Sequence, residues 1–190
     1  MDLKFPLRSV FLALPLEGPA KWQFQALQEE LKAYEESLSF QNPQSPHLTL
    51  YFWPSVLELE LKGILAQAEK IAAAAVPFLL SVTEADTFGS RGEDRVLFLK
   101  VAFSDALARI KKSCPWPNRE PFAPHITLAR VRHPQRFNVV KKKVMKALER
   151  VTFAIPVDRL RLYAEVDGAK QTPLKEFPFE RKMESSGTSS

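Results

Sequence analysis

The chain has 190 residues, is 45% hydrophobic and contains 15 prolines and 6 glycines, which excludes a protein that is disordered throughout and suits one domain or two small lobes sharing a core. Its single cysteine, Cys114, excludes an intramolecular disulfide, and no apolar run reaches the roughly 20 residues of a membrane span. Without a recognisable signal peptide, and with a net charge of +5, the sequence predicts a soluble cytoplasmic protein.

Hydrophobic periodicity and turn residues predict the elements in chain order. The first half is expected to contain a strand at 9–15, a helix at 20–39, a strand at 47–53 and a helix at 56–75. The second half is expected to contain strands at 78–85 and 95–103, a helix at 104–113, a strand at 125–131, a helix at 137–150 and strands at 151–155, 160–166 and 174–179. We expect residues 184–190 to form a disordered polar tail. These elements indicate the α+β class, in two related halves with helices packed against mainly antiparallel sheets.

The charge is distributed unevenly along the chain. Residues 1–95 hold 8 Lys and Arg against 13 Asp and Glu, whereas residues 96–190 hold 19 against 9. The basic half includes the run Lys141-Lys142-Lys143, and such a concentration of cations suggests a phosphate-rich partner. The alternative for the lysine run is a solvated helix face.

One pentad occurs twice. Pro46-His47-Leu48-Thr49-Leu50 returns 78 residues later as Pro124-His125-Ile126-Thr127-Leu128, and the two copies use two of the three histidines in the chain. Because residues i and i+2 of a strand share one face, each copy presents an imidazole and a hydroxyl on one side and two aliphatic side chains on the other. We expect the aliphatic side to enter the core and the polar side to line a cleft.

Two such strands facing each other would bring together two imidazoles and two hydroxyls. Histidine, whose ordinary pKa is about 6.5, exchanges protons near neutral pH, so one ring can accept a proton while the other donates one. Threonine hydroxyls can donate hydrogen bonds to phosphate oxygens. A single histidine on a strand is more often structural, but repetition with the same neighbours favours an active site.

The sequence lacks the motifs that are typical of other catalytic and cofactor-binding sites. The sequence contains no Gly-x-Ser-x-Gly elbow, no phosphate-binding Gly-x-x-x-x-Gly-Lys loop and no Gly-x-Gly-x-x-Gly fingerprint. Cys114 and His133 stand in no zinc-ligand spacing with the repeated histidines, so we expect neither a metal nor a cofactor. His133, followed by a proline, is interpreted as a surface loop residue.

The second motif and its surroundings resemble a known family. The stretch Pro121-Phe122-Ala123-Pro124-His125-Ile126-Thr127-Leu128-Ala129-Arg130, with Arg95-Val96-Leu97-Phe98-Leu99 upstream, is similar to the two-histidine (2H) phosphoesterases, and within them to the RNA 2′,3′-cyclic phosphodiesterase or 2′-5′ RNA ligase group. The resemblance implies one bilobal domain over residues 1–183, with a duplicated fold, two mainly antiparallel sheets flanked by helices, and the active-site cleft between the lobes.

The resemblance also implies roles for the motif residues. His47 would be the acid that protonates the leaving 3′ oxygen and His125 the base that activates water, while Thr49 and Thr127 hold the phosphate. The reaction would open a 2′,3′-cyclic phosphate to a 2′-phosphate without a metal. Arg130 is a candidate phosphate contact, with a surface salt bridge as the alternative.

The run after the first motif departs from the family, which tends to have a small residue there. This chain has Tyr51-Phe52-Trp53-Pro54. We interpret Tyr51 and Phe122 as substrate contacts that stack on a base, with core packing as the alternative. Core packing is the expectation for Phe52, which continues the face of Leu48 and Leu50.

The function expected from the sequence is therefore hydrolysis of cyclic phosphate ends of RNA or nucleotides, with 2′-5′ RNA ligation as a further activity. Two alternatives stay open. One is a module that binds RNA ends or nucleotides without turnover, and the other is a related enzyme for 2′-5′ oligoadenylate or an ADP-ribose cyclic phosphate. The expected partners are RNA ends or nucleotides with a cyclic phosphate, with no membrane and no metal, and we expect a monomer.

Overall fold

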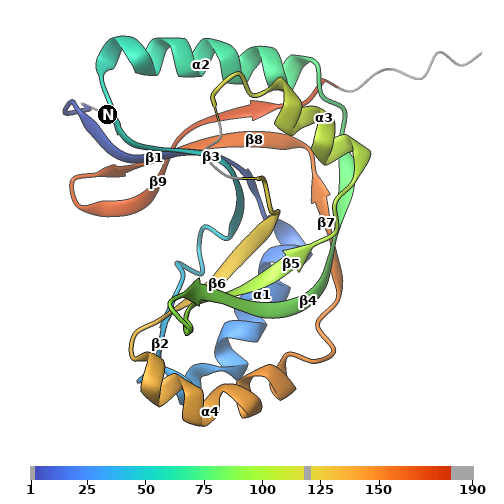
Figure 1. Cartoon of the computed structure of the whole chain (residues 1–190). Coiled ribbons are helices and arrows are strands. Elements are labelled where there is room, and N and C mark those ends of the chain that lie inside the picture. Colours follow the sequence, from blue (N-terminus) through green and yellow to red (C-terminus); the bar gives the residue numbers. More distant parts are fainter. Residues whose placement is uncertain (1–2, 118–120, 181–190) are drawn as a thin grey trace, which may run out of the picture.

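The computed structural model of the chain describes residues 3–117 and 121–180 (Figure 1). In chain order the elements are β1 (Leu7–Pro15), α1 (Gly18–Glu30), a 3₁₀ turn (Lys32–Tyr34), β2 (Leu38–Phe40), β3 (His47–Val56), α2 (Glu58–Ala73), β4 (Phe78–Ser90), β5 (Glu93–Val101), α3 (Asp105–Ser113), β6 (His125–Val131), α4 (Pro134–Ala147), β7 (Phe153–Val157), β8 (Arg159–Val166) and β9 (Ala169–Pro178). The tail predicted at residues 184–190 lies outside the described residues.

The strands form two sheets with antiparallel pairing throughout. One sheet has the order β3-β1-β8-β9 and the other the order β2-β6-β5-β4-β7. Figure 1 shows α2 over the outer side of the first sheet, at the top, and α1 and α4 on the far side of the second, at the bottom. The two motif strands, β3 and β6, contact each other where the sheets meet. The α+β class and the bilobal arrangement of two antiparallel sheets are confirmed.

Strand β1 holds the first sheet together. It pairs with β3 on one side and with β8 on the other, and every residue from Val10 to Leu16 is buried. Such burial requires apolar side chains on both faces, and its sequence VFLALPL supplies them. One face joins the main core, while Phe11 and Ala13 form a separate cluster with Tyr163 of β8.

Two predicted elements have different bounds in the structure. The helix predicted at 20–39 ends at Glu30, and residues 38–40 form β2 instead. Leu38 pairs with Val131 of β6 and is fully buried. Pairing in the second sheet therefore overrides the helical spacing of the apolar residues in the segment 20–39. The hairpin of β4 and β5 is longer than predicted because its turn needs only Arg91 and Gly92, which have φ angles of 57° and 76°. A two-residue turn with both φ angles positive matches the twist of antiparallel strands.

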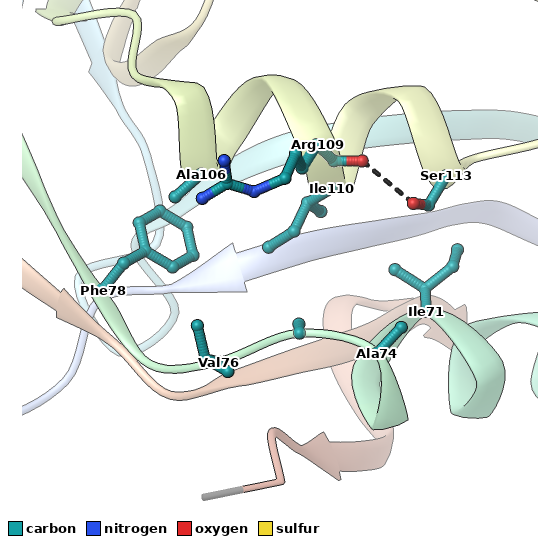
Figure 2. A pocket seen from close by; sticks show the side chains of 9 residues that line it. Ile71, Ala74, Val76, Phe78, Ala106, Arg109, Ile110 and Ser113 are labelled. Carbon is teal, nitrogen blue, oxygen red and sulfur yellow. Dashed lines mark hydrogen bonds between the residues drawn. The ribbon is translucent and has the colours of Figure 1, made fainter. Parts of the chain in front are cut away.

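Helix α3 covers the junction between the end of α2 and the start of β4. Figure 2 shows Arg109 of α3 extended beside Ala106, near the ring of Phe78, while the hydroxyl of Ser113 donates to the Arg109 carbonyl at 2.9 Å. The small hollow beneath has a volume of about 70 Å³ and is lined mainly by aliphatic side chains. A space of this size has room for little more than water, so we assign it no ligand.

Candidate active site

Both motif histidines are oriented by the same backbone contact. The Nδ1 atom of His47 lies 2.6 Å from the carbonyl oxygen of Ser45, and Nδ1 of His125 lies 2.8 Å from that of Ala123. A carbonyl oxygen only accepts hydrogen bonds, so Nδ1 carries the hydrogen in both rings. Each neutral ring therefore keeps its Nε2 atom as a proton acceptor. The proline that precedes each histidine is the residue between the histidine and the carbonyl that its ring contacts.

The ring of His47 rests on two buried aromatic rings. It stacks on Phe11 with the centroids 4.6 Å apart, and the Tyr163 ring lies 5.4 Å away and 4.8 Å from Phe11. Arg161 donates to the Tyr163 hydroxyl at 3.2 Å and forms an ion pair with Glu17 at 2.6 Å. Arg161 is also paired with Glu176, so two carboxylates hold the arginine that fixes the tyrosine next to His47.

The surroundings of His47 change its acidity. Burial, together with the nearby His125 imidazole, lowers the pKa of His47 to about 4, against the opposing effect of its hydrogen bond to Ser45. The strands that carry the two histidines, β3 and β6, contact each other, and a positive charge on His125 opposes one on His47. His47 is neutral in the free protein at neutral pH.

His125 has a different environment from His47. Phe88 and Phe98 meet its ring edge to face, with centroids 5.5 Å and 5.6 Å away. Strand β6 pairs with β5 so that His125 lies opposite Lys100 and Thr127 lies opposite Phe98. Because cross-strand partners share a face of the sheet, Thr127 lies on the same face as His125.

Each motif strand contains a β-bulge at the leucine that ends the pentad. Thr49 and Tyr51 pair with consecutive residues of β1, and Thr127 and Ala129 pair with consecutive residues of β5, so Leu50 and Leu128 are the extra residues. An extra residue shifts the alternation of faces by one. The fifth residue after each histidine therefore lies on the histidine's side of its sheet.

The bulges relocate two residues that the sequence had singled out. Phe52 is 51% exposed and lies opposite Phe11, so the prediction that it packs in the core with Leu48 and Leu50 is wrong. Its counterpart in the second motif is Arg130, which lies opposite Val96 on the face of His125 and Thr127. Arg130 is exposed and forms no salt bridge with any residue in the described part of the chain.

Side chains from two helices donate hydrogen bonds to the backbone carbonyl groups of the bulge residues. The Leu128 carbonyl accepts from Nε2 of Gln28, on α1, at 3.1 Å, and the Leu50 carbonyl accepts from Nζ of Lys111, on α3, at 2.5 Å. The Leu128 carbonyl also accepts from the backbone N–H of Gln41 at 3.0 Å, so Gln28 adds a second donor there. The two motifs thus share their sequence, their bulge and the way that bulge is capped.

A cleft of about 1130 Å³ runs along β3 from Thr49 to Pro54 and reaches β6 at His125. Four predicted site residues line it, namely Thr49, Tyr51, Phe122 and His125. His47 and Thr127, though partly exposed, are not among its lining, and neither is Arg130. Four of the seven predicted site residues thus lie on the cleft wall, and three do not.

The lysine run predicted to meet a phosphate-rich partner lies on α4, away from this lining. Lys141 pairs with Asp94 at 2.9 Å, and Lys142 and Lys143 are exposed. Helix α4 buries Phe137 and Val144 on its other side.

Sequence reasoning missed several residues around the site. Lys111, Phe88, Phe98 and Tyr163 were not singled out, because each stands in an ordinary helix or strand pattern. Alternation along β4 and β5 would have placed the two phenylalanines on one face, but no local signal distinguishes Lys111 from Lys112. Tyr163 comes beneath His47 only through the pairing of β1 with β8.

No group of three or more His, Cys, Asp or Glu side chains suited to a metal ion occurs within residues 3–117 and 121–180. In the same residues no helix is both long and apolar enough to cross a membrane.

The model of the 2′-5′ RNA ligase superfamily matches residues 15–169. The chain belongs to this superfamily. An RNA 2′,3′-cyclic phosphodiesterase of Methanothermobacter thermautotrophicus is 26% identical over 133 residues, which are 66% of this chain and 72% of that protein. One of Geobacillus stearothermophilus is 30% identical over 131 residues, which are 63% of this chain but only 41% of that protein. The resemblance to the two-histidine phosphoesterases is confirmed.

Solved structures share the fold of this superfamily member. The protein TT0787 of Thermus thermophilus has a TM-score of 0.71 at 23% identity, covering 92% of this chain and 100% of that one. LigT of E. coli, crystallised with ATP, has a TM-score of 0.62 at 22% identity, covering 93% and 99%. At these identities the likeness is one of fold.

The lowered pKa of His47 predicts how stability depends on pH. Between about pH 6.5 and pH 4 the unfolded chain binds a proton at this residue that the folded chain does not, so stability falls as the pH is lowered through this window. From pH 7 to pH 5 this lowers the free energy of unfolding by about 2 kcal/mol. Urea denaturation at both pH values should show this loss in the wild type and a smaller one in His47→Gln. Equal losses in the two proteins would contradict the assignment.

The capped bulge at Leu128 predicts a stability effect on a distant helix. Gln28→Ala removes the hydrogen bonds to the carbonyls of Leu128 and Gln41, and we expect the free energy of unfolding to fall by about 1–2 kcal/mol. Gln23→Ala, at an exposed position of the same helix, is the matched control and should change it little. Denaturant titration measures both, and equal values for the two variants would refute the role of Gln28.

Proposed function

We propose that the protein is a metal-independent phosphodiesterase that opens 2′,3′-cyclic phosphates at the ends of RNA or nucleotides to 2′-phosphates. The observation that supports this most strongly is the pair of imidazoles, each oriented through Nδ1 by the same backbone contact and carried on two strands that contact each other. Membership of the 2′-5′ RNA ligase superfamily, and relatives named RNA 2′,3′-cyclic phosphodiesterase, support the same reaction.

In the proposed reaction Nε2 of His125 takes a proton from water as the water oxygen bonds to phosphorus. The bond from phosphorus to O3′ breaks, and Nε2 of His47 gives that oxygen a proton, which leaves a 2′-phosphate. The hydroxyls of Thr49 and Thr127 donate to the non-bridging oxygens, where charge builds up in the transition state.

Three further residues are proposed as substrate contacts. Tyr51 and Phe122 lie on the cleft wall and offer ring faces to a base, and Arg130 places a positive charge on the face of His125. Of these, Arg130 acts at longer range, because it is not part of the lining.

The role of His47 as an acid requires that it gain a proton when substrate binds. The pKa of about 4 describes the free protein, where burial opposes a charged ring. An anionic phosphate between the two histidines provides an opposite charge and raises the pKa of the His47 ring. The substrate thus helps to charge the residue that protonates it.

The proposal predicts the effect of removing either ring. His47→Ala and His125→Ala should each reduce kcat for a nucleoside 2′,3′-cyclic phosphate by at least about 10²-fold, the usual contribution of a general acid or base. His133→Ala, at an exposed histidine outside the cleft, is the matched control and should retain activity. A chelator should have no effect. Full turnover by either motif variant, or loss of turnover with EDTA, would refute the proposal.

A change of leaving group tests which histidine is the acid. Nitrophenolate leaves without being protonated, so a nitrophenyl phosphodiester needs a base but no acid. We expect His47→Ala to lose much less activity on that ester than on the cyclic phosphate, whereas His125→Ala loses activity on both. The reverse pattern, measured as kcat/KM for the two substrates, would assign the acid to His125.

A further inference from the structure

The cleft is larger than one nucleotide needs, and aromatic side chains line it at several places. Sites for small molecules usually measure about 300–1,000 Å³, and this one measures about 1130 Å³. Phe88 and Phe98 form one group beside His125. A second group consists of Tyr51 and Trp53 of β3 together with Trp116, which contacts both rings but is not part of the lining, and we call these three residues the aromatic platform.

The rings of the platform support one another. Tyr51 and Trp53 have centroids 4.6 Å apart, and Trp116 meets Trp53 edge-on at 4.8 Å and Tyr51 at 5.5 Å. Tyr51 and Trp53 line the cleft and are only partly buried, while the Tyr51 hydroxyl donates to the Pro117 carbonyl at 3.0 Å. The rings are therefore held in place while their cleft side remains accessible.

Lys111 anchors this platform to the motif strand. Its Nζ atom donates to the Leu50 carbonyl and lies 5.6 Å from the centre of the Tyr51 ring and 4.9 Å from that of Phe122. The same residue that caps the bulge thus fixes the position of the platform relative to Thr49. Thr49 and two platform residues, Tyr51 and Trp53, thus line a single cavity.

The distance along β3 determines which part of a ligand reaches the platform. Thr49 and Trp53 pair with Ala13 and Val10, which are three residues apart on β1, so they lie about 10 Å apart along the strand. Past the bulge at Leu50, Tyr51 and Trp53 lie on the other face of β3 from Thr49, and all three line the cleft at this edge strand. In a nucleoside cyclic phosphate a single ribose separates the phosphorus from the base, so the base of the reacting nucleotide falls short of Trp53. The base of the next nucleotide reaches it.

We propose that the aromatic platform is a stacking subsite for the base of the nucleotide that precedes the terminal cyclic phosphate. The ligand class is then an RNA end at least two nucleotides long, in preference to a mononucleotide. This inference rests on the proposed function for the position of the phosphate. Stacking on an aromatic side chain tolerates any base, so the subsite selects length and not sequence.

Binding of product analogues tests the subsite without requiring turnover. Three ligands are compared by isothermal titration calorimetry: adenosine 2′-phosphate, the adenosine dinucleotide ending in a 2′-phosphate, and the same dinucleotide without its 5′ base. We expect the full dinucleotide to bind at least about tenfold more tightly than the other two, the factor that one stacked base supplies. Equal affinities would overturn the proposal. Tight binding of the form without the 5′ base would also overturn it, because an extra phosphate would then be the cause.

Variants assign the preference to the platform. In Trp53→Ala the affinity ratio of dinucleotide to mononucleotide should fall to near one, while Trp53→Phe, which keeps a ring, should retain most of it. Trp22→Ala removes a tryptophan that is 67% exposed on α1 and should leave the ratio as in the wild type. A ratio that survives in Trp53→Ala, with the fold verified by circular dichroism, would refute the subsite.

The two proposals fail in different ways. If the dinucleotide binds preferentially but no cyclic phosphate is hydrolysed, the proposed function is wrong and the subsite stands. If cyclic phosphates are hydrolysed but the affinity ratio is near one in the wild type, the subsite is wrong and the function stands.

Discussion

The hydrogen bond from Nδ1 of each motif histidine to the carbonyl two residues earlier is the contact on which the rest of the site depends. It fixes the tautomer and directs Nε2 outward in both rings. Two strand segments that differ only at Leu48 and Ile126 thereby supply two equivalent proton-exchanging atoms. The fold then makes them different, because His47 lies on the Phe11 and Tyr163 rings whereas His125 meets two phenylalanine edges at the cleft.

The repeated bulges extend this duplication beyond the pentads. By adding one residue, Leu50 and Leu128 turn Phe52 and Arg130 to the histidine side, so the two halves of the site present an aromatic ring and a cation at equivalent positions. Helices contribute through the bulge carbonyls, which bind Lys111 and Gln28. Helix packing, bulge geometry and the direction of the site residues are therefore coupled, and a change in one helix can alter the cleft without touching a motif residue.

Much of this arrangement could be predicted from the sequence, for reasons that are local. The alternation of His and Thr with aliphatic residues determines their face, and β6 begins and ends where it was predicted, at His125 and Val131. The bulges could not be predicted, because Leu50 and Leu128 are ordinary strand residues whose extra position appears only in the pairing with β1 and β5. For the same reason Phe52 was assigned to the wrong face. Leu38 was assigned to a helix and not to a strand, because its partner in the sheet, Val131, lies 93 residues away in the sequence.

The central claim is that the two histidines open a cyclic phosphate by releasing O3′. Phosphorus NMR of a nucleoside 2′,3′-cyclic phosphate incubated with the protein and EDTA tests it most directly, because the cyclic ester and the two monoester products have distinct resonances. The account predicts complete conversion to the 2′-phosphate alone. Formation of the 3′-phosphate, or an unchanged cyclic ester, would contradict it.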